Sequence, residues 1–136
     1  MNKILVPLDG SKNSIRGLKF ALIVARQSGA SVIGMNVCSL PIFVKTSASM
    51  RNKIRQKSKE IVKEAEVVAQ KAQVSFTSMI KVSNNVGSTI VAFAASQRAD
   101  MIIIGSRGPD PEIELFLGSV ANHVVNKSKI PVTVVK

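Results

Sequence analysis

The chain has 136 residues, which is enough for one domain with a hydrophobic core and no supporting disulfide or metal. A hydrophobic content of 46% with 20% charged residues excludes a disordered chain. No apolar run reaches the roughly 20 residues of a membrane-spanning helix. A single cysteine, Cys38, cannot form an internal disulfide and fits a reducing cytoplasm. The formal net charge of +11 favours polyanionic partners such as nucleotides, nucleic acids or anionic surfaces.

The first part of the chain predicts a strand followed by a helix. Residues 3–8 form a short apolar run typical of a buried strand, and residues 9–14 form a polar turn. Apolar residues spaced three to four apart then predict one buried helix face. These residues are Ile15, Leu18, Leu22 and Ala25. Gly29 is expected to end this helix.

The middle of the chain repeats this order with a longer helix. Residues 30–38 predict a second strand, and residues 39–49 predict a loop. Residues 50–72 predict a helix whose lysines and glutamates lie mostly away from its apolar face. Residues 74–82 alternate between apolar and polar side chains, which indicates a half-exposed strand at a sheet edge.

The last part predicts two further strands and two helices. A helix is expected over residues 86–98 and a final helix over residues 118–127. Residues 101–104 are the most hydrophobic short run, as in a central parallel strand, and residues 131–136 predict the fifth strand. Because strands and helices alternate, we expect one α/β domain over residues 1–136, with an open parallel sheet and helices on both faces.

A glycine-rich loop after the fourth strand predicts a phosphate-binding site. Gly105 and Gly108 lack side chains, so backbone amides there can approach a phosphate closely. Gly118 and Ser119 open the last helix, whose first amides lack intrahelical partners and favour an anion. Arg107 can neutralise phosphate charge if it turns inward. The alternative is an ordinary strand-to-helix loop in which Gly118 and Ser119 only cap the helix.

Asp9 follows the first predicted strand. Because ligands of open parallel sheets bind at the carboxyl ends of the strands, we expect Asp9 to lie beside the same crevice. Its carboxylate can accept hydrogen bonds from ribose hydroxyls. The alternative is a structural role, either as a helix cap or in an Asx-turn. The two roles are compatible.

The spacing of the glycines resembles the motif of the universal stress protein family, in its ATP-binding branch. The motif reads Gly105-x-x-Gly108, nine residues, then Gly118-Ser119. The segments Val-Pro-Leu-Asp-Gly-Ser11 and Pro-Val-Thr-Val-Val135 are also similar to that family. The resemblance implies an adenine nucleotide alpha hydrolase-like fold with strand order 3-2-1-4-5 and ATP in the crevice. It also implies a homodimer paired through the last strand, from Pro131 to Lys136.

By position, the resemblance also implies roles for individual residues. Pro7 and Asp9 would lie beside the adenosine, with Asp9 on the ribose, and the backbone of Val37 would contact adenine. The residues expected to hold the phosphates are Gly105, Gly108, Gly118, Ser119 and the amide of Val120. Arg107 occupies a variable position of the motif. The implied function is a nucleotide-responsive regulatory or stress module rather than a dedicated enzyme, with at most slow, incidental ATP hydrolysis.

The spacer inside the motif departs from the family pattern because it carries Asp110, Glu112 and Glu114. These carboxylates either repel a triphosphate, help to hold a divalent cation such as Mg²⁺, or face solvent. Two alternative functions therefore stay open at the crevice. One is a dimeric interaction module that does not bind ATP tightly, and the other is a weak ATPase.

A basic region between Lys45 and Lys63 carries seven lysines and arginines and one acid, Glu60. A solvated helix face is the favoured interpretation, and non-specific nucleic-acid contact is the less favoured one. His123 has no second metal ligand in the sequence pattern and is expected at or near the surface. Cys38 is expected to be a buried thiol.

Overall fold

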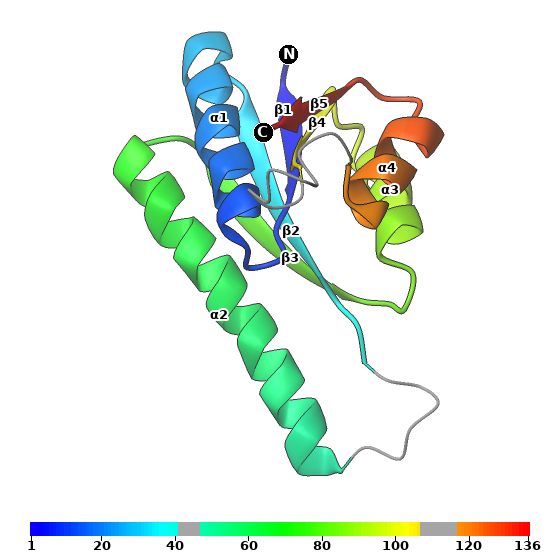
Figure 1. Cartoon of the computed structure of the whole chain (residues 1–136). Coiled ribbons are helices and arrows are strands. Elements are labelled where there is room, and N and C mark those ends of the chain that lie inside the picture. The colour runs from blue at the N-terminus through cyan, green and yellow to red at the C-terminus, as the bar shows by residue number, and fades with distance from the viewer. Residues whose placement is uncertain (41–46, 107–116) are drawn as a thin grey trace.

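The computed structural model describes residues 1–40, 47–106 and 117–136. In these segments five strands alternate with four helices along the chain (Figure 1). The strands are β1 (Lys3–Pro7), β2 (Ser31–Cys38), β3 (Phe76–Val82), β4 (Met101–Gly105) and β5 (Val132–Val135). The helices are α1 (Lys12–Ser28), α2 (Ala48–Ala72), α3 (Val86–Ser96) and α4 (Ser119–Lys127).

All five strands form one parallel sheet in the order β3-β2-β1-β4-β5, which confirms the predicted fold. β1 lies at the centre, and the chain moves outward from it first to β3 and later to β5. Strands β1 and β4 pair only at Ile4–Met101 and Leu5–Ile102. The order of strands reverses between these two, which is where open parallel sheets form their ligand crevices.

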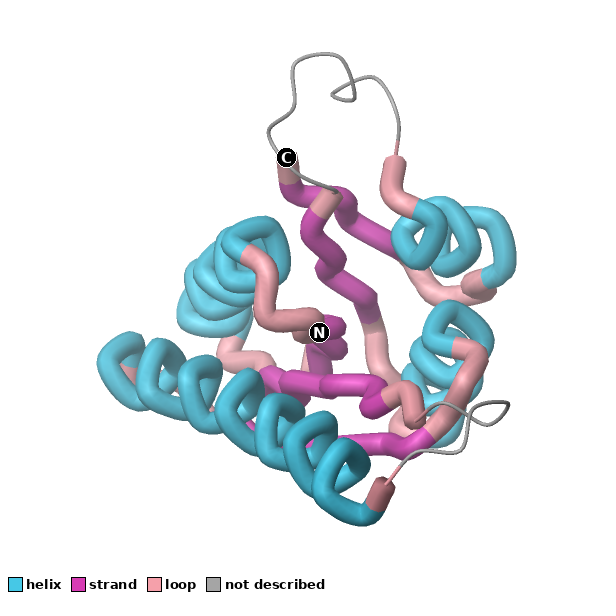
Figure 2. The backbone as a smooth tube through the Cα atoms, turned by 60° about the horizontal axis from the view of Figure 1, so that its bottom comes forward, coloured by secondary structure: helices cyan, strands magenta, loops and turns pink. Residues whose placement is uncertain are grey.

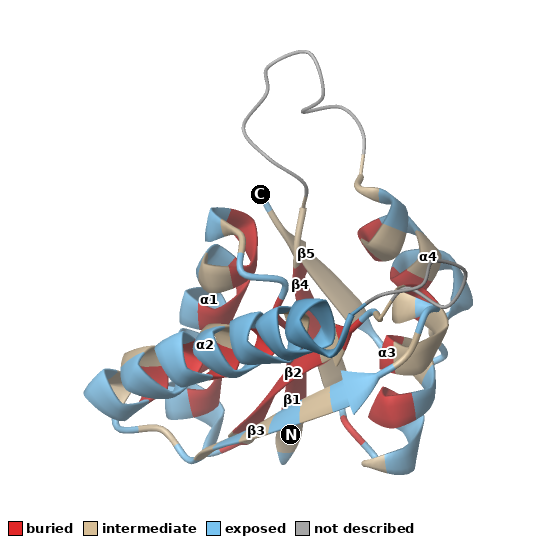
Figure 3. Cartoon of the chain, turned by 90° about the horizontal axis from the view of Figure 1, so that it is seen from below, coloured by how far each residue is buried: buried red, intermediate tan, exposed pale blue. Residues whose placement is uncertain are grey.

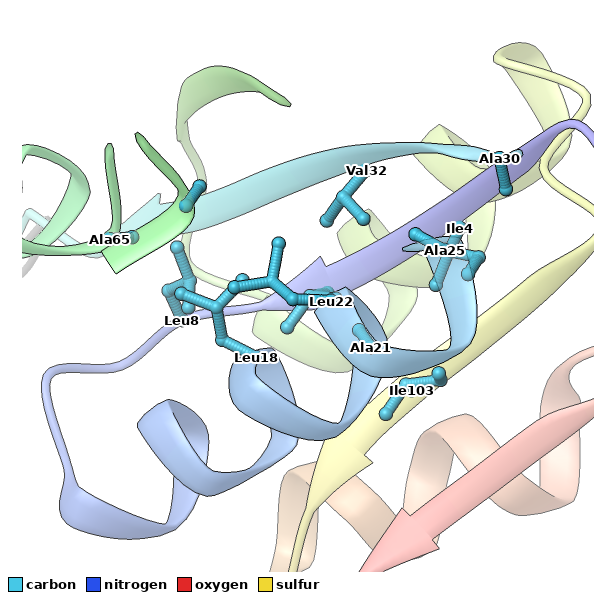
Figure 4. Close-up of a cluster of buried hydrophobic side chains, with 12 residues drawn as sticks. Ile4, Leu8, Leu18, Ala21, Leu22, Ala25, Ala30, Val32, Ala65 and Ile103 are labelled. Carbon is cyan, nitrogen blue, oxygen red and sulfur yellow. The ribbon is translucent and has the colours of Figure 1, made fainter. Parts of the chain in front are cut away.

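Helices cover both faces of the sheet, as Figure 2 shows. On one face, α1 and α2 pack over a core that includes Ile4, Val32 and Ile103, each with no exposed surface. Figure 4 shows the α1 side chains Leu18, Ala21, Leu22 and Ala25 directed toward these strands. On the other face, α3 and α4 pack over a second core. Its fully buried members include Leu5, Ile102 and Val124.

The edge position predicted for residues 74–82 is confirmed. β3 pairs with β2 on one side only, and its side chains alternate between half-buried and exposed as far as Lys81. The predicted ends of the other elements differ from the observed ones by a few residues. None of the helices in the described segments has the length and apolar character needed to cross a membrane.

The largest difference from the predicted boundaries is at the start of α1. Residues 12–14, expected in the polar turn, instead form the first turn of the helix. The Ser11 hydroxyl caps it by accepting a hydrogen bond from the Ser14 amide at 3.1 Å. The Ser14 hydroxyl donates to the Ser11 carbonyl at 3.0 Å. Gly29 ends the helix with φ of 75°, as predicted from its position.

Backbone-to-backbone packing joins the start of α1 to the end of β4. A Cβ atom added to Gly105 would overlap the carbonyl oxygen of Asn13 and lie 2.6 Å from its carbonyl carbon. A Cβ added to Gly17 would lie 3.2 Å from the Gly105 amide nitrogen. Glycine is therefore required at position 105 by packing alone, in addition to any contact with a ligand.

Gly105→Ala should destabilise the fold by about 3 kcal/mol or more, because rigid backbone rather than a flexible side chain occupies the space of the new methyl group. The matched control is Gly29→Ala. Nothing lies within 4 Å of a Cβ at Gly29, so only the positive φ is strained, which costs about 1 to 2 kcal/mol. Urea unfolding of both variants measures the difference. Equal losses of stability would contradict the packing interpretation.

Candidate functional site

A cavity of about 990 Å³ opens at the carboxyl ends of β1, β2 and β4. This crevice is bounded by the turn after β1, the first turns of α1 and the N-terminus of α4. Its volume is at the upper end of the range typical of small-molecule sites, roughly 300 to 1,000 Å³. The crevice therefore has room for a ligand of nucleotide size.

Most of the sequence-predicted site residues line this crevice, although they come from distant parts of the chain. These residues are Pro7, Asp9, Val37, Gly105, Gly118, Ser119 and Val120. Arg107 and Gly108, together with the acidic spacer, lie outside the described residues. The structure thus brings together the two halves of the crevice that the sequence predicted separately.

Asp9 lies at the mouth of the crevice in an Asx-turn, where its carboxylate accepts a hydrogen bond from the Ser11 amide at 2.8 Å. Desolvation by the surrounding protein raises the pKa of this carboxyl, but hydrogen bonds from Ser11 and Ser14 outweigh it. The net effect is a pKa below the ordinary value of 3.8. Asp9 is therefore a carboxylate at neutral pH and an acceptor for hydroxyl groups.

The turn that carries Asp9 is anchored to β2 through its neighbour Leu8. The Leu8 amide donates to the Met35 carbonyl at 2.7 Å. The side-chain amide of Asn36 donates to the Leu8 carbonyl at 2.8 Å. Because both the amide and the carbonyl of Leu8 are bonded to β2, the position of Asp9 is set by β2 as well as by β1.

Asn13 and Asn36 add buried polar groups to the crevice lining. Asn13 is 6% exposed and Asn36 is 5% exposed. The side-chain oxygen of each has no hydrogen-bond partner. Unpartnered buried acceptors are rare in folded proteins and indicate a donor from a ligand or a water molecule. Asp9 therefore supplies the exposed acceptor on this side of the crevice, whereas the two asparagine oxygens are buried.

The opposite wall, at the start of α4, is rich in donors. Gly118 is the N-cap, and it supplies no side-chain acceptor to the helix. The other three helices are each capped by a side chain, from Ser11, Ser47 and Asn85. The Asn122 amide bonds to the Gly118 carbonyl at 2.8 Å, so the three preceding amides of α4 have no intrahelical acceptor. The positive end of this helix dipole is directed at the crevice.

Apolar and charged side chains divide the rest of the lining. The apolar side chains of the lining include Met35, Val37, Val86 and Ile90, which can pack against a planar base. The charged residues of the lining on α1 and α2 are Lys12, Arg16, Lys19 and Glu64. With Asp9, the described lining holds three cations and two acids, an excess of positive charge that favours an anionic ligand.

Several of these lining residues were not identified from the sequence. Asn36 could have been noticed as the one amide side chain in an otherwise apolar strand. Asn13 belongs to the polar segment after β1 and had a comparable signal. Lys12, Arg16 and Lys19 could not be assigned, because their approach to the crevice depends on how α1 packs on the sheet.

Cys38 and His123 are the remaining side chains that the sequence analysis considered. Cys38 is buried with a free thiol, as expected. His123 is half-buried on α4, and its ring lies against Gly87 of α3, where a Cβ would be 2.7 Å from the ring. Within the described residues, no three His, Cys, Asp or Glu side chains gather into a metal-binding group.

Comparison with known proteins places this geometry in a family. The model of the universal stress protein family matches residues 1–136. A universal stress protein of Methanocaldococcus jannaschii is 30% identical over 98% of this chain and 81% of its own length. The structure of a universal stress protein from Archaeoglobus fulgidus is 29% identical, with a TM-score of 0.83 over 100% of this chain and 99% of that one.

A second structure from Archaeoglobus fulgidus is a complex of the universal stress protein with dAMP. It is 28% identical to this chain, with a TM-score of 0.76 over 100% of this chain and 98% of that one. Family model, sequence relatives and solved structures agree over essentially the whole length. The chain belongs to the universal stress protein family.

Proposed function

We propose that the chain is an ATP-binding regulatory module of the universal stress type, which binds ATP in the crevice and responds to its level. Pro7, Val37 and the apolar residues beside them contact the adenosine, and Asp9 accepts from the ribose. Gly105, Gly118, Ser119 and the Val120 amide hold the phosphates. Arg107 and Gly108, which lie outside the described residues, complete the phosphate loop of the proposed site.

The observation that carries this proposal is the opposite polarity of the two walls. The first amides of α4, which have no intrahelical acceptor, suit phosphate oxygens, and the Asp9 carboxylate suits hydroxyl donors. A nucleotide carries both ribose hydroxyls and phosphate oxygens. Inorganic phosphate lacks the ribose, and a free nucleoside lacks the phosphate. The apolar surface near Ile90 adds a place for the base.

The dAMP complex of the Archaeoglobus fulgidus relative supports an adenine nucleotide as the ligand class. The triphosphate is proposed from the net charge of the chain and from the cations Lys12, Arg16 and Lys19 along the crevice. Mg²⁺ is proposed as a companion of ATP, held mainly by the phosphates themselves. We propose that binding rather than turnover is the function.

Saturating Mg-ATP should raise the free energy of unfolding of the wild-type protein. A ligand at about 100 times its dissociation constant adds roughly 2.7 kcal/mol. Gly118→Val should abolish this gain, because its side chain would cover the amides at the start of α4. The backbone of Gly118 has φ of −60° and ψ of 160°, which valine adopts without strain, so the variant should fold.

The matched control is Asn85→Val, at the N-cap of α3, a residue that is not part of the crevice lining. It loses a capping hydrogen bond, worth about 1 kcal/mol, yet should keep the full gain with Mg-ATP. Thermal unfolding with and without nucleotide measures both variants. If the wild type shows no gain at millimolar Mg-ATP, ATP binding is wrong. A gain that survives in Gly118→Val would show that the phosphates bind elsewhere.

Asp9→Ala should remove the preference for ribose hydroxyls. In the wild type, ATP should bind about tenfold tighter than 2′,3′-dideoxy-ATP, the value of one hydrogen bond to a charged acceptor. In Asp9→Ala the two ligands should bind alike. Because the pKa of Asp9 is lowered, the wild-type preference should be constant from pH 8 down to pH 5. Calorimetric titration checks this, and an equal preference in both proteins would place Asp9 away from the ribose.

We also propose that two copies pair through β5, the strand from Val132 to Val135 within the segment from Pro131 to Lys136. β5 is an edge strand made of three valines and a threonine. It contains no charge, proline or bulge of the kind that normally protects an exposed edge. A second copy of the same strand would satisfy its outward backbone groups.

Val134→Pro should convert the proposed dimer to a monomer. The carbonyls of Pro131 and Val135 accept from Ile102 and Ser106 of the β4 side. Since strand residues alternate, Val132 and Val134 direct their N–H groups to the open edge. Proline at 134 therefore removes an outward donor and leaves the bonds to β4 intact.

The control for this variant is Val82→Pro, at the end of the opposite edge strand β3. Val82 is 60% exposed, and its N–H also faces away from the sheet, since the neighbouring Ser83 amide donates to Cys38 of β2. Light scattering after size exclusion gives the mass of each protein. A dimeric Val134→Pro, or a monomeric wild type, would rule out pairing through β5.

A further inference from the structure

The first three turns of α2, residues 48–59, carry an unusual concentration of positive charge. This segment, here called the basic arm, contains five cations and no acid: Arg51, Lys53, Arg55, Lys57 and Lys59. Every one of these five residues is exposed. The arm therefore contributes nearly half of the formal net charge of +11 from one short helical segment.

The basic arm contributes few residues to the hydrophobic core. The buried residues of α2 are Ser58, Val62, Ala65 and Ala69, so all but the first lie beyond the arm. In the arm itself, only Ile54 and Ser58 are not exposed. Figure 1 shows this end of α2 extending past the ends of the strands, and Figure 3 shows its outer surface as exposed. The arm is thus accessible from several sides.

Four of the five cations of the arm lack a neutralising partner among the described residues. Lys53, Arg55, Lys57 and Lys59 have no ion-pair partner within 4.0 Å in the described part of the chain. The acids of the same helix, Glu60, Glu64 and Glu66, all follow the arm. Glu66 accepts a hydrogen bond from Ser78 of β3, and Glu64 lines the crevice.

This arrangement is unfavourable for the helix that carries it. The first turn of α2 contains no acid, and cations near a helix N-terminus oppose the helix dipole. Lys53 and Lys57 are like charges four residues apart, and so are Arg55 and Lys59, which repel each other on the helix surface. A polyanion alongside the arm would remove both kinds of repulsion.

We propose that the basic arm binds the sugar–phosphate backbone of double-stranded nucleic acid, without reading its sequence. A helix of this diameter fits the major groove of a duplex, about 12 Å wide, and twelve helical residues span about 18 Å. Single strands fit less well, because the arm has no aromatic side chain on which bases could stack. A membrane surface fits less well because Met50 and Ile54 are its only large apolar residues.

The arm lies outside the crevice, since Glu64 is the only residue of α2 in the described crevice lining. Nucleic-acid binding can therefore be tested independently of ATP binding. Its test uses the full chain without nucleotide and a fluorescent DNA duplex of about 20 base pairs, with fluorescence anisotropy measured between roughly 50 and 200 mM salt.

The arm variant combines Lys53→Gln, Arg55→Gln, Lys57→Gln and Lys59→Gln. Its matched control combines Arg26→Gln, Lys71→Gln, Lys127→Gln and Lys129→Gln, four exposed residues outside the arm, the described crevice lining and the segment from Pro131 to Lys136. Both lower the formal net charge from +11 by four, to +7. A difference between them therefore reports the location of the charge rather than its total.

The arm variant should bind the duplex at least about tenfold more weakly at low salt than the control. The slope of log affinity against log salt should be shallower than that of the control by about 3.6, since each of four lost phosphate contacts removes about 0.9. The arm variant should also unfold at or above the wild-type temperature, because the repulsion is relieved, so a loss of binding cannot be attributed to misfolding.

Equal weakening in the two variants would overturn the proposal, as would a wild-type protein that fails to bind the duplex at low salt. Competition distinguishes the other polyanions. Polyglutamate and vesicles of anionic lipid should displace the duplex less effectively than unlabelled DNA at equal charge. If either displaces it equally well, the assignment to nucleic acid is wrong.

Discussion

The contact on which the site depends is the approach of two backbones, where the first turn of α1 meets the end of β4. Gly105 and Gly17 permit it, because a Cβ at Gly105 would overlap the Asn13 carbonyl. This contact fixes the N-terminus of α1 beside the end of β4, so the turn that carries Asp9 and the end of β4 at Gly105 line the same crevice. Residues nearly a hundred positions apart in sequence thereby act on the same volume, and the limited pairing of β1 with β4 leaves that volume open.

The two walls differ in polarity for reasons that lie in local structure. The β1 side presents an acceptor because Asp9 closes an Asx-turn with its carboxylate at the mouth of the crevice. The α4 side holds donors because its N-cap is glycine, which supplies no side-chain acceptor to the first amides of the helix. The cations of the chain are also concentrated in particular places. Cations line the crevice along α1, and a separate group of cations projects on the basic arm of α2, so two distinct surfaces carry a local excess of positive charge.

Much of the fold was predictable because its signals are local. The buried strands, the alternation in β3 and the glycine that ends α1 each depend on neighbours in sequence, and the strand order followed from the resemblance to a family. The start of α1 was predicted too late, because serine and asparagine look like turn residues until Ser11 is seen to cap the helix. The glycine at 105 was interpreted as a phosphate contact, and its packing role was not predictable because Asn13 approaches it only in the folded chain. The same reason hid the contribution of Asn36, which acts through the carbonyl of Leu8.

The central claim is that one nucleotide contacts both walls of the crevice at once. Titration of isotopically labelled protein with Mg-ATP, followed through its backbone amide resonances, tests this residue by residue. The account predicts saturable shifts with one common dissociation constant at the α4 amides of Ser119, Val120 and Ala121 and at the turn amides of Gly10 and Ser11, while the exposed end of α2 stays unchanged. Shifts confined to the basic arm, or absent from the start of α4, would contradict it.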